Sequence, residues 1–587
     1  MNDFLVNKNK KKKEYSNFYL PGEEISITRK DMFSQWDNFE TSNSDYIGKK
    51  RILLGIKLCL LAYLIVSFRL FGICVLPNMN KQEESITYAK KENIHRTNIV
   101  DINGNIVATS LPTIDLNINT KNILSPKKTA EALTKILPNL EFDTIYKKLK
   151  NKKGNYLLAK GLTPHQHAQI LAIGEPGLEA IANEKRVYPH KNLLSHVVGF
   201  TDIDNQGLTG IEKGMNDVIV ETQLPIHLTV DIGIQDTIRS ILYSNVKKYN
   251  ADGATAILMN VNNGEIVSLV SLPDFNPNDI SKKDEAAQFN KATFYVYEPG
   301  SVLKIFNTAM ALDGGKIRIS ESFDATEPLK LKAHVIKDFH PENRWLSVEE
   351  TLVHSSNIAS ARIALKSGFE EQYNFLKKIK FMESLDMELI ETAKPLVPPV
   401  SRWEKTDSNI ATIGYGYGIS VTPMHIISAY SAMINGGIYH NPTLVKNSNI
   451  DKKGVRVISD NTSKQMRKLM RAVVTKGSGK KADVLGYDVG GKTGTANKLV
   501  NGRYDNKTVV TTFVSAFPIS NPQYALLVMM DSPKRTKETF GFNTAGWNSV
   551  PTASEIIKAI APQLNVQANF DLDEVINSKI IEASFGR

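Results

Sequence analysis

Residues 297–306 read YEPGSVLKIF, where a Pro-Gly pair directly precedes Ser301 and an apolar run follows it. Proline and glycine interrupt regular structure and the apolar run has helical periodicity, so the pattern predicts Ser301 at a helix N-terminus. Lys304 follows at i+3, on the same helix face. Backbone N–H groups at a helix N-terminus favour an anion, and a lysine with a lowered pKa can remove a hydroxyl proton. We therefore predict Ser301 as a nucleophile and Lys304 as its base.

The Ser-x-x-Lys spacing is a weak signal by itself, because the chain repeats it at Ser125/Lys128, Ser244/Lys247 and Ser478/Lys481. Each of these is interpreted as a surface pair. Ser301 differs in the Pro-Gly pair before it and in the company of two later motifs. Ser355-Ser356-Asn357 comes directly behind a helix that a capping box, Ser347 to Glu350, opens. Residues 490–496 read GGKTGTA, and their small side chains allow a ligand to approach a strand closely.

A second Ser-x-Asn occurs at residues 459–461, just ahead of an expected helix over residues 463–475. Its short polar side chains are explained as a helix N-cap, so Ser355 and Asn357 are preferred. A Ser-His-Asp mechanism would need a histidine base, and the candidates are His340, His354 and His425. Nothing in the sequence ties these histidines to an exposed serine, and we interpret them as core or surface residues. No cluster has metal-ligand spacing, so neither a metal nor a cofactor is expected.

The C-terminal half has strand-like runs at both of its ends. Residues 254–261 and 265–272 read as two strands joined by an Asn-Asn-Gly turn, and strand-like runs return at residues 509–517 and 524–531. A helical stretch over residues 234–246 precedes them, and helical patterns fill the middle. This order predicts one antiparallel sheet flanked by helices, an α+β sandwich. Upstream, short alternating runs around Asn103-Gly104 indicate a separate mixed α+β module.

An apolar segment over residues 52–76 precedes both modules and is predicted to be a single transmembrane helix. Its ~25 residues suffice to cross a hydrocarbon core of about 30 Å. Lys57 and Arg69 interrupt it near its ends, where long side chains can reach the interface. No small-x-small cleavage site follows, so an uncleaved anchor is expected in place of a signal peptide. The basic residues 49–51 abut its N-terminal end, which predicts a cytoplasmic tail and export of everything beyond Pro77.

The net charge of +11 does not indicate a nucleic-acid-binding protein, because the basic residues are interleaved with 61 acidic ones and no basic stripe with aromatics occurs. The densest basic run, residues 8–13, lies in a polar tail that is expected to be solvated. The two cysteines, Cys59 and Cys74, both fall in the apolar segment. A disulfide framework is therefore not expected.

The ordered trio of Ser-x-x-Lys, Ser-x-Asn and Lys-Thr-Gly is the signature of the serine penicillin-recognising enzymes. Further upstream the chain resembles the class B penicillin-binding proteins in four pedestal motifs, at residues 96–104 (RTNIVDING), 186–189 (RVYP), 196–199 (HVVG) and 207–212 (GLTGIE). The usual Arg-Gly of the first motif is Arg-Thr here. Asn357 and the GYGYG at residues 414–418 resemble the cell-division (septal) type, and the elongation type is the alternative.

The resemblance implies a penicillin-sensitive peptidoglycan D,D-transpeptidase that cross-links stem peptides ending in D-Ala-D-Ala. It implies that the donor peptide acylates Ser301 with loss of the terminal D-Ala, that Lys304 is the base, and that β-lactams acylate the same serine. Ser355 would relay a proton to the leaving amine, and Asn357 would hold Lys304 and the substrate amide.

For the third motif the resemblance implies that Lys492 supplies positive potential and that the substrate is bound by Thr493, Gly494 and Thr495. The backbone N–H groups of Ser301 and Thr495 would form the oxyanion hole. The implied partners are a membrane glycosyltransferase and other division proteins, and the implied location is the cytoplasmic (inner) membrane with a periplasmic catalytic domain.

These observations predict five regions: a tail over 1–51, an anchor over 52–76, a pedestal over 77–227, a transpeptidase domain over 228–565 and a polar tail over 566–587. A β-lactamase would need neither the anchor nor the pedestal, and a bifunctional synthase would need a glycosyltransferase domain for which the pedestal leaves too little room. A penicillin sensor usually has more membrane segments. A division scaffold with little intrinsic catalysis remains an alternative.

Overall fold

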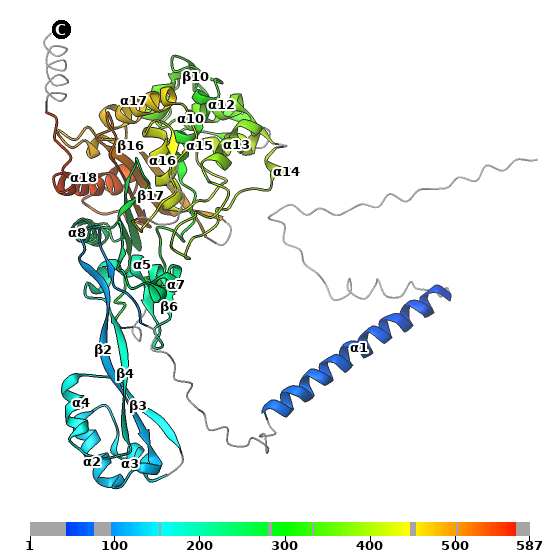
Figure 1. Cartoon of the computed structure of the whole chain (residues 1–587). Coiled ribbons are helices and arrows are strands. Elements are labelled where there is room, and N and C mark those ends of the chain that lie inside the picture. Colours follow the sequence, from blue (N-terminus) through cyan, green and yellow to red (C-terminus); the bar gives the residue numbers. More distant parts are fainter. Residues whose placement is uncertain are drawn as a thin grey trace, which may run out of the picture. The chain divides into compact units, whose positions relative to one another are not determined.

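The computed structural model describes residues 43–74, 95–151, 154–279, 285–331, 334–404, 406–446, 454–500 and 503–570. The chain has two compact units, Met1–Lys91 and Glu92–Arg587 (Figure 1). Residues 1–42 of the predicted N-terminal tail and residues 571–587 of the predicted C-terminal tail lie outside the described residues.

The first unit contains one long helix, α1 (Asn43–Cys74). The prediction of a helix over residues 52–76 is confirmed as far as residue 74, and the last two residues lie outside the described part. Cys59 has an exposed free thiol. Over the residues that the structure describes, no helix is both long enough and apolar enough to span a bilayer.

The second unit begins with a mixed α+β module, as the alternating runs predicted. Its sheet has the order β3-β2-β1-β7, with β4 paired to β2. The long strands β2 (Ile106–Asn119) and β4 (Leu178–Val187) run antiparallel (Figure 1). The remaining strands of this sheet are β1 (Ile99–Val100), β3 (Asn155–Leu162) and β7 (Ile226–His227).

Two groups of helices belong to this module. At one end of the β2–β4 ribbon, α2 (Pro126–Ile136), α3 (Phe142–Lys150) and α4 (Pro164–Leu171) enclose a small core of their own (Figure 1). The other end carries α5 (Ser195–Val198), α6 (Gly210–Gly214), α7 (Asn216–Glu221) and the short strands β5 (Phe200–Thr201) and β6 (Gly207–Thr209). There, buried side chains such as Val197 and Ile211 belong to the same core cluster as the first strand of the next module.

The next module is built on a five-stranded antiparallel sheet with the order β16-β17-β18-β8-β9. Its strands are β8 (Gly253–Asn260), β9 (Ile266–Leu272), β16 (Gly490–Val500), β17 (Arg503–Phe517) and β18 (Tyr524–Asp531). Strand β8, from the start of the module, pairs with β18, from its end, which confirms the predicted sheet. The strand prediction at residues 509–517 was too short, because the polar residues before it have no apolar alternation and yet continue the hairpin with β16.

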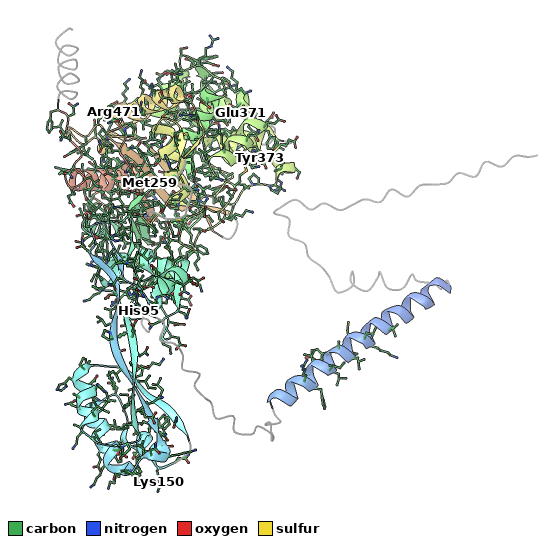
Figure 2. The ribbon with its side chains drawn as sticks, viewed as in Figure 1. His95, Lys150, Met259, Glu371, Tyr373 and Arg471 are labelled. Atoms are coloured by element: carbon green, nitrogen blue, oxygen red, sulfur yellow. The ribbon has the colours of Figure 1, made fainter. Side chains whose placement is uncertain are left out.

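Helices cover both faces of this sheet, as the α+β sandwich requires. Successive residues of a strand point to opposite faces, and Leu258 of β8 packs in the core of α8 (Ile232–Lys248) and α18 (Ser549–Ile560), while Met259 packs in the other core. The second layer contains α10 (Leu303–Asp313), α12 (Asn357–Ser367), α13 (Phe369–Lys378), α15 (Asp407–Tyr415), α16 (Pro423–Ile434) and α17 (Asp460–Lys476). Figure 2 shows Met259 among the side chains of this module and Tyr373 on α13.

Candidate active site

Ser301 stands in a short 3₁₀ turn, Gly300–Val302, that leads directly into α10, as the sequence predicted. Gly300 has φ +56°, a conformation that glycine adopts at no steric cost. The edge strand β16 passes close to this turn, since a Cβ added at Gly494 would lie 2.6 Å from the carbonyl oxygen of Pro299. Gly494 therefore lets the Lys-Thr-Gly strand approach the nucleophile.

Lys304 is fully buried in the first turn of α10, and its side-chain nitrogen contacts residues of two of the three motifs. Its Nζ lies 3.0 Å from Oγ of Ser301. It also lies 2.6 Å from the carbonyl oxygen and 3.2 Å from Oγ of Ser355, and 2.7 Å from Oδ1 of Asn357. A proton can thus pass from Ser301 to Lys304 and on to Ser355 over hydrogen-bond distances.

Ser355 and Asn357 are placed by the turn between α11 (Val348–Val353) and α12. The predicted capping box at Ser347 and Glu350 is present and opens α11. Ser355 has φ +57°, which is unusual for a residue with a side chain. The turn brings both the carbonyl oxygen and the hydroxyl of Ser355 to Lys304.

Strand β16 brings the third motif to the same place. Nζ of Lys492 lies 3.0 Å from Oγ of Ser355, on which the two lysines converge. The hydroxyl of Thr493 lies 2.6 Å from Oγ of Ser478, and the hydroxyl of Thr495 accepts a hydrogen bond from the N–H of Ala545 at 3.1 Å. The structure therefore brings together all eight predicted site residues, which are Ser301, Lys304, Ser355, Asn357, Lys492, Thr493, Gly494 and Thr495.

The electrostatics of the site favour an uncharged Lys304. Burial lowers the pKa of Lys304 well below its ordinary value, the neighbouring ammonium of Lys492 lowers it further, and the carboxylate of Asp338 opposes both. Burial lowers the pKa of Lys492 to about 7. An uncharged amine beside a serine hydroxyl can act as a general base, so this geometry can support acyl transfer through a serine ester.

The second Ser-x-Asn and the three candidate histidines occupy structural positions in the fold. Ser459 is the N-cap of α17 and accepts a hydrogen bond from the N–H of Thr462, as predicted. His425 is buried between Thr422 and the carbonyl oxygen of Glu383. His354 pairs with Glu342, and His340 is exposed with its ring edge on Phe339.

Two residues near the site were not predicted. The carboxylate of Asp338 accepts hydrogen bonds at the N-terminus of α12, although it lies outside every motif. Ser478 was interpreted as part of a surface pair, yet its hydroxyl contacts Thr493. No local pattern marks Ser478, whereas an aspartate shortly after a strand-like run is a weak hint of a cap.

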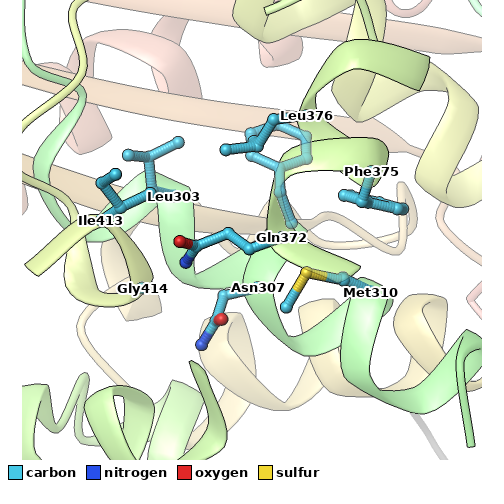
Figure 3. Close-up of a pocket in the computed structure, with 9 residues that line it drawn as sticks. Leu303, Asn307, Met310, Gln372, Phe375, Leu376, Ile413 and Gly414 are labelled. Carbon is cyan, nitrogen blue, oxygen red and sulfur yellow. The ribbon is translucent and has the colours of Figure 1, made fainter. Parts of the chain in front are cut away.

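A small, mostly apolar pocket beside α10 has none of the predicted site residues in its lining (Figure 3). It is lined by residues of α10, α13 and α15, and Figure 3 shows the two amides Asn307 and Gln372 between the apolar side chains. The Asn307 amide donates to the carbonyl oxygen of Ser360, and the Gln372 amide donates to that of Ile410. The first contact holds α10 on α12, and the second joins α13 to α15.

Comparison with known proteins identifies two family domains in the chain. Residues 254–557 match the penicillin binding protein transpeptidase domain, and residues 91–219 match the penicillin-binding protein dimerisation domain. The probable peptidoglycan D,D-transpeptidase FtsI of Caulobacter vibrioides is 33% identical over 505 residues, which cover 84% of this chain and 85% of that protein.

More distant relatives cover similar lengths. The peptidoglycan D,D-transpeptidase FtsI of Escherichia coli is 26% identical over 88% of this chain and 92% of its own length, and the stage V sporulation protein D of Bacillus subtilis is 28% identical over 89% and 87%. A crystal structure of penicillin binding protein 3 from Mycobacterium tuberculosis, complexed with aztreonam, superimposes with a TM-score of 0.65 at 22% identity, over 81% of this chain and 98% of that one. That structural similarity establishes the fold.

The sequence motifs, the antiparallel sheet with helices on both faces and the two matching domains agree with one another. The chain belongs to the class B penicillin-binding proteins, which carry a dimerisation domain ahead of a transpeptidase domain.

Proposed function

We propose that this chain is a peptidoglycan D,D-transpeptidase that works through an acyl-enzyme at Ser301. The observation that carries the proposal is the position of the buried Lys304 amine, 3.0 Å from Oγ of Ser301 and within hydrogen-bond distance of Ser355 and Asn357. The names of its relatives in Caulobacter vibrioides and Escherichia coli support the same reaction.

In the first half-reaction, Oγ of Ser301 attacks the carbonyl carbon of the penultimate D-Ala while Lys304 takes the hydroxyl proton. The oxyanion forms between the backbone N–H groups of Ser301 and Thr495. The C–N bond to the terminal D-Ala then breaks, and Ser355 passes the proton from Lys304 to the leaving amine. The products are an ester at Ser301 and free D-Ala.

In the second half-reaction, an amine of an acceptor stem peptide attacks the ester carbonyl carbon and loses its proton along the same path. The C–O bond breaks and Ser301 regains its proton, so the net change is an exchange of one amide bond for another. Lys492 supplies positive potential, Thr493 and Thr495 bind the terminal carboxylate of the donor peptide, and Gly494 between them belongs to the same substrate-binding strand.

The wider assignment rests on the sequence and the relatives. The chain acts in septal cell-wall synthesis, as the relatives named FtsI suggest. Residues 52–76 anchor it in the cytoplasmic membrane, the tail over 1–51 is cytoplasmic, and the pedestal (77–227) and transpeptidase domain (228–565) are exported. A membrane glycosyltransferase and other division proteins are its partners. Protease added to spheroplasts should then digest the region beyond Pro77 and spare the first 50 or so residues, and protection of the large domain would overturn this topology.

Covalent labelling with a fluorescent penicillin tests the catalytic assignment on the detergent-solubilised full chain. Ser301→Ala should abolish the label. Ser244→Ala is the matched control, because Ser244 also stands three residues before a lysine but is exposed on α8. Labelling that survives in Ser301→Ala would contradict the proposed nucleophile.

A further inference from the structure

The carboxylate of Asp338 holds the turn that contains Ser355 and Asn357. It follows β12 (His334–Ile336) and accepts hydrogen bonds from Oγ of Ser356 at 2.7 Å and from the backbone N–H of Ile358 at 3.0 Å. It also accepts one from the backbone N–H of Asn357. Three donors at the N-terminus of α12 thus converge on one carboxylate.

These bonds bear directly on the conformation of Ser355. Its φ of +57° is sparsely populated by residues with a side chain and persists only where the surroundings impose it. On its C-terminal side, Ser356 and Asn357 are both held by Asp338, and the N–H of Ser356 donates to the carbonyl oxygen of Thr351 at 3.0 Å. The residues that follow Ser355 are therefore held both by Asp338 and by the backbone of α11.

The same segment also orients Asn357. Its Nδ2 donates to the carbonyl oxygen of Lys337 at 2.9 Å, and its Oδ1 faces Nζ of Lys304 at 2.7 Å. Lys337 directly precedes Asp338. The Lys337 carbonyl oxygen thus holds the side chain of Asn357, and the Asp338 carboxylate holds its backbone N–H. The hydrogen bonds of Lys304 to Ser355 and Asn357 depend on this arrangement.

We propose that Asp338 is a positioning residue for the reaction, which keeps Ser355 and Asn357 directed at Lys304 through its hydrogen bonds to Ser356, Asn357 and Ile358. This inference rests on the proposed function. A carboxylate suits the task because both of its oxygens accept hydrogen bonds, whereas an asparagine keeps one acceptor oxygen for the two backbone N–H groups and would turn its NH2 group toward Oγ of Ser356.

Asp338 has a second, electrostatic effect that provides a specific readout. The charged groups that act on Lys304 are Lys492, which lowers the pKa of Lys304, and Asp338, which raises it. Acylation requires uncharged Lys304, so its rate falls as the pH drops through that pKa. Removal of the Asp338 charge should therefore move the acidic limb of the pH–rate profile to lower pH.

The chain offers a matched control for the test. Asp313, at the end of α10, caps α17 in the same way: its Oδ1 accepts from the N–H of Ser459 at 2.7 Å and from the hydroxyl of Thr462 at 2.9 Å. Asp313→Asn and Asp338→Asn thus both neutralise a carboxylate that accepts hydrogen bonds at the start of a helix. Only the second cap lies at the residues that contact Lys304.

The experiment measures the second-order rate of acylation by a fluorescent penicillin as a function of pH, together with the melting temperature. Asp338→Asn should slow acylation about tenfold to a hundredfold, the range expected for misplaced catalytic groups, with the acidic limb at lower pH. Asp313→Asn should acylate like the wild type. Ser356→Ala keeps the charge and removes one of the three bonds, so it should slow acylation less and leave the limb in place.

Wild-type acylation by both Asp338→Asn and Ser356→Ala would overturn the inference. Equal slowing by Asp338→Asn and Asp313→Asn, with no change in pH profile, would also overturn it, because the effect would then be general destabilisation. If Asp338→Asn does not fold, the result for Ser356→Ala decides. Failure of the proposed function itself would be recognised separately, by labelling that persists in Ser301→Ala.

Discussion

Arg96 and Glu212 form a fully buried ion pair, with 2.6 Å between Nη2 and Oε2, although 116 residues separate them in the sequence. Both residues belong to motifs at which the chain resembles the class B penicillin-binding proteins. The structure adds a second arginine, because Nε of Arg186 lies 2.7 Å from Oε1 of the same carboxylate. Arg186 also donates to the carbonyl oxygen of Thr97, so the triad connects the segment just before β1 with β4 and α6.

Removal of the Glu212 carboxylate should therefore destabilise the pedestal strongly. Glu212→Ala leaves two buried guanidinium groups without their counter-charge, and breaking a buried pair typically costs about 3–5 kcal/mol. We expect a much lower melting temperature for Glu212→Ala than for Ser301→Ala in calorimetry. Equal melting temperatures for the two variants would show that the triad contributes little.

The roles of the two buried lysines can be separated by arginine substitution. A lysine with an ordinary pKa of about 10.4 would be uncharged only ~0.04% of the time at pH 7, so the lowered pKa of Lys304 is needed for its proposed role. Lys304→Arg keeps a charge but cannot deprotonate, and should lose at least about a hundredfold in β-lactam acylation. Lys492→Arg preserves positive potential and should lose less. Equal acylation rates for the two variants would show that the role of base has been assigned to the wrong lysine.

Glu298 provides a pH-dependent test of the segment that precedes the nucleophile. Its Oε1 accepts hydrogen bonds from the N–H of Gly418 at 2.7 Å and the hydroxyl of Tyr504 at 3.0 Å, and its buried Oε2 has no hydrogen-bond partner among the described residues. Burial raises the pKa of Glu298. Because the folded chain holds this proton more tightly than the unfolded chain, the carboxyl favours folding below its unfolded pKa, and this contribution is lost as the pH rises through the folded pKa.

Glu298→Gln keeps the acceptor oxygen and removes the charge. Its melting temperature should therefore rise relative to the wild type as the pH increases from about 4 to 8. Tyr504→Phe removes a donor to the carboxylate and should lower stability most at the high end of that range. A difference between Glu298→Gln and wild type that does not change with pH would contradict this prediction.

His196 should make the fold sensitive to acid. Its Nε2 lies 2.8 Å from the carbonyl oxygen of Ala287, and burial lowers the pKa of His196 from 6.5 to about 4. Between these pKa values the unfolded chain binds a proton at His196 and the folded chain does not. The stability that neutral His196 contributes is therefore present above pH 6.5 and is lost as the pH falls toward 4. The size of the effect is about 3 kcal/mol.

Chemical denaturation of His196→Gln and of the wild type between pH 6.5 and about 4 measures this loss of stability. The variant can still donate to Ala287, and its stability should fall less steeply with acid than that of the wild type. His165→Gln is the control, since His165 is exposed on α4, and it should keep the wild-type slope. Parallel slopes for all three proteins would rule out His196 as the source.

The features that the sequence predicted correctly depend on local geometry. A serine and a lysine at i+3 share a helix face wherever the helix lies, so Ser301 and Lys304 could be paired from the sequence alone. The N-cap at Ser459 and the capping box at Ser347 follow from hydrogen bonds within one turn. The order of strands and helices was likewise sufficient to predict the sandwich.

Other features were decided only by the packing of distant segments. The pKa values of Lys304 and Lys492 depend on burial and on the distance between strand β16 and helix α10, which no spacing in the sequence specifies. Asp338 became a partner of Ser356 because β12 ends beside α12, and Arg186 joined Glu212 because the end of β4 lies beside α6. Local periodicity sets which residues share a face of a helix or strand, whereas the tertiary structure sets which faces meet. Exclusion of solvent between those faces shifts the pKa values of the buried groups.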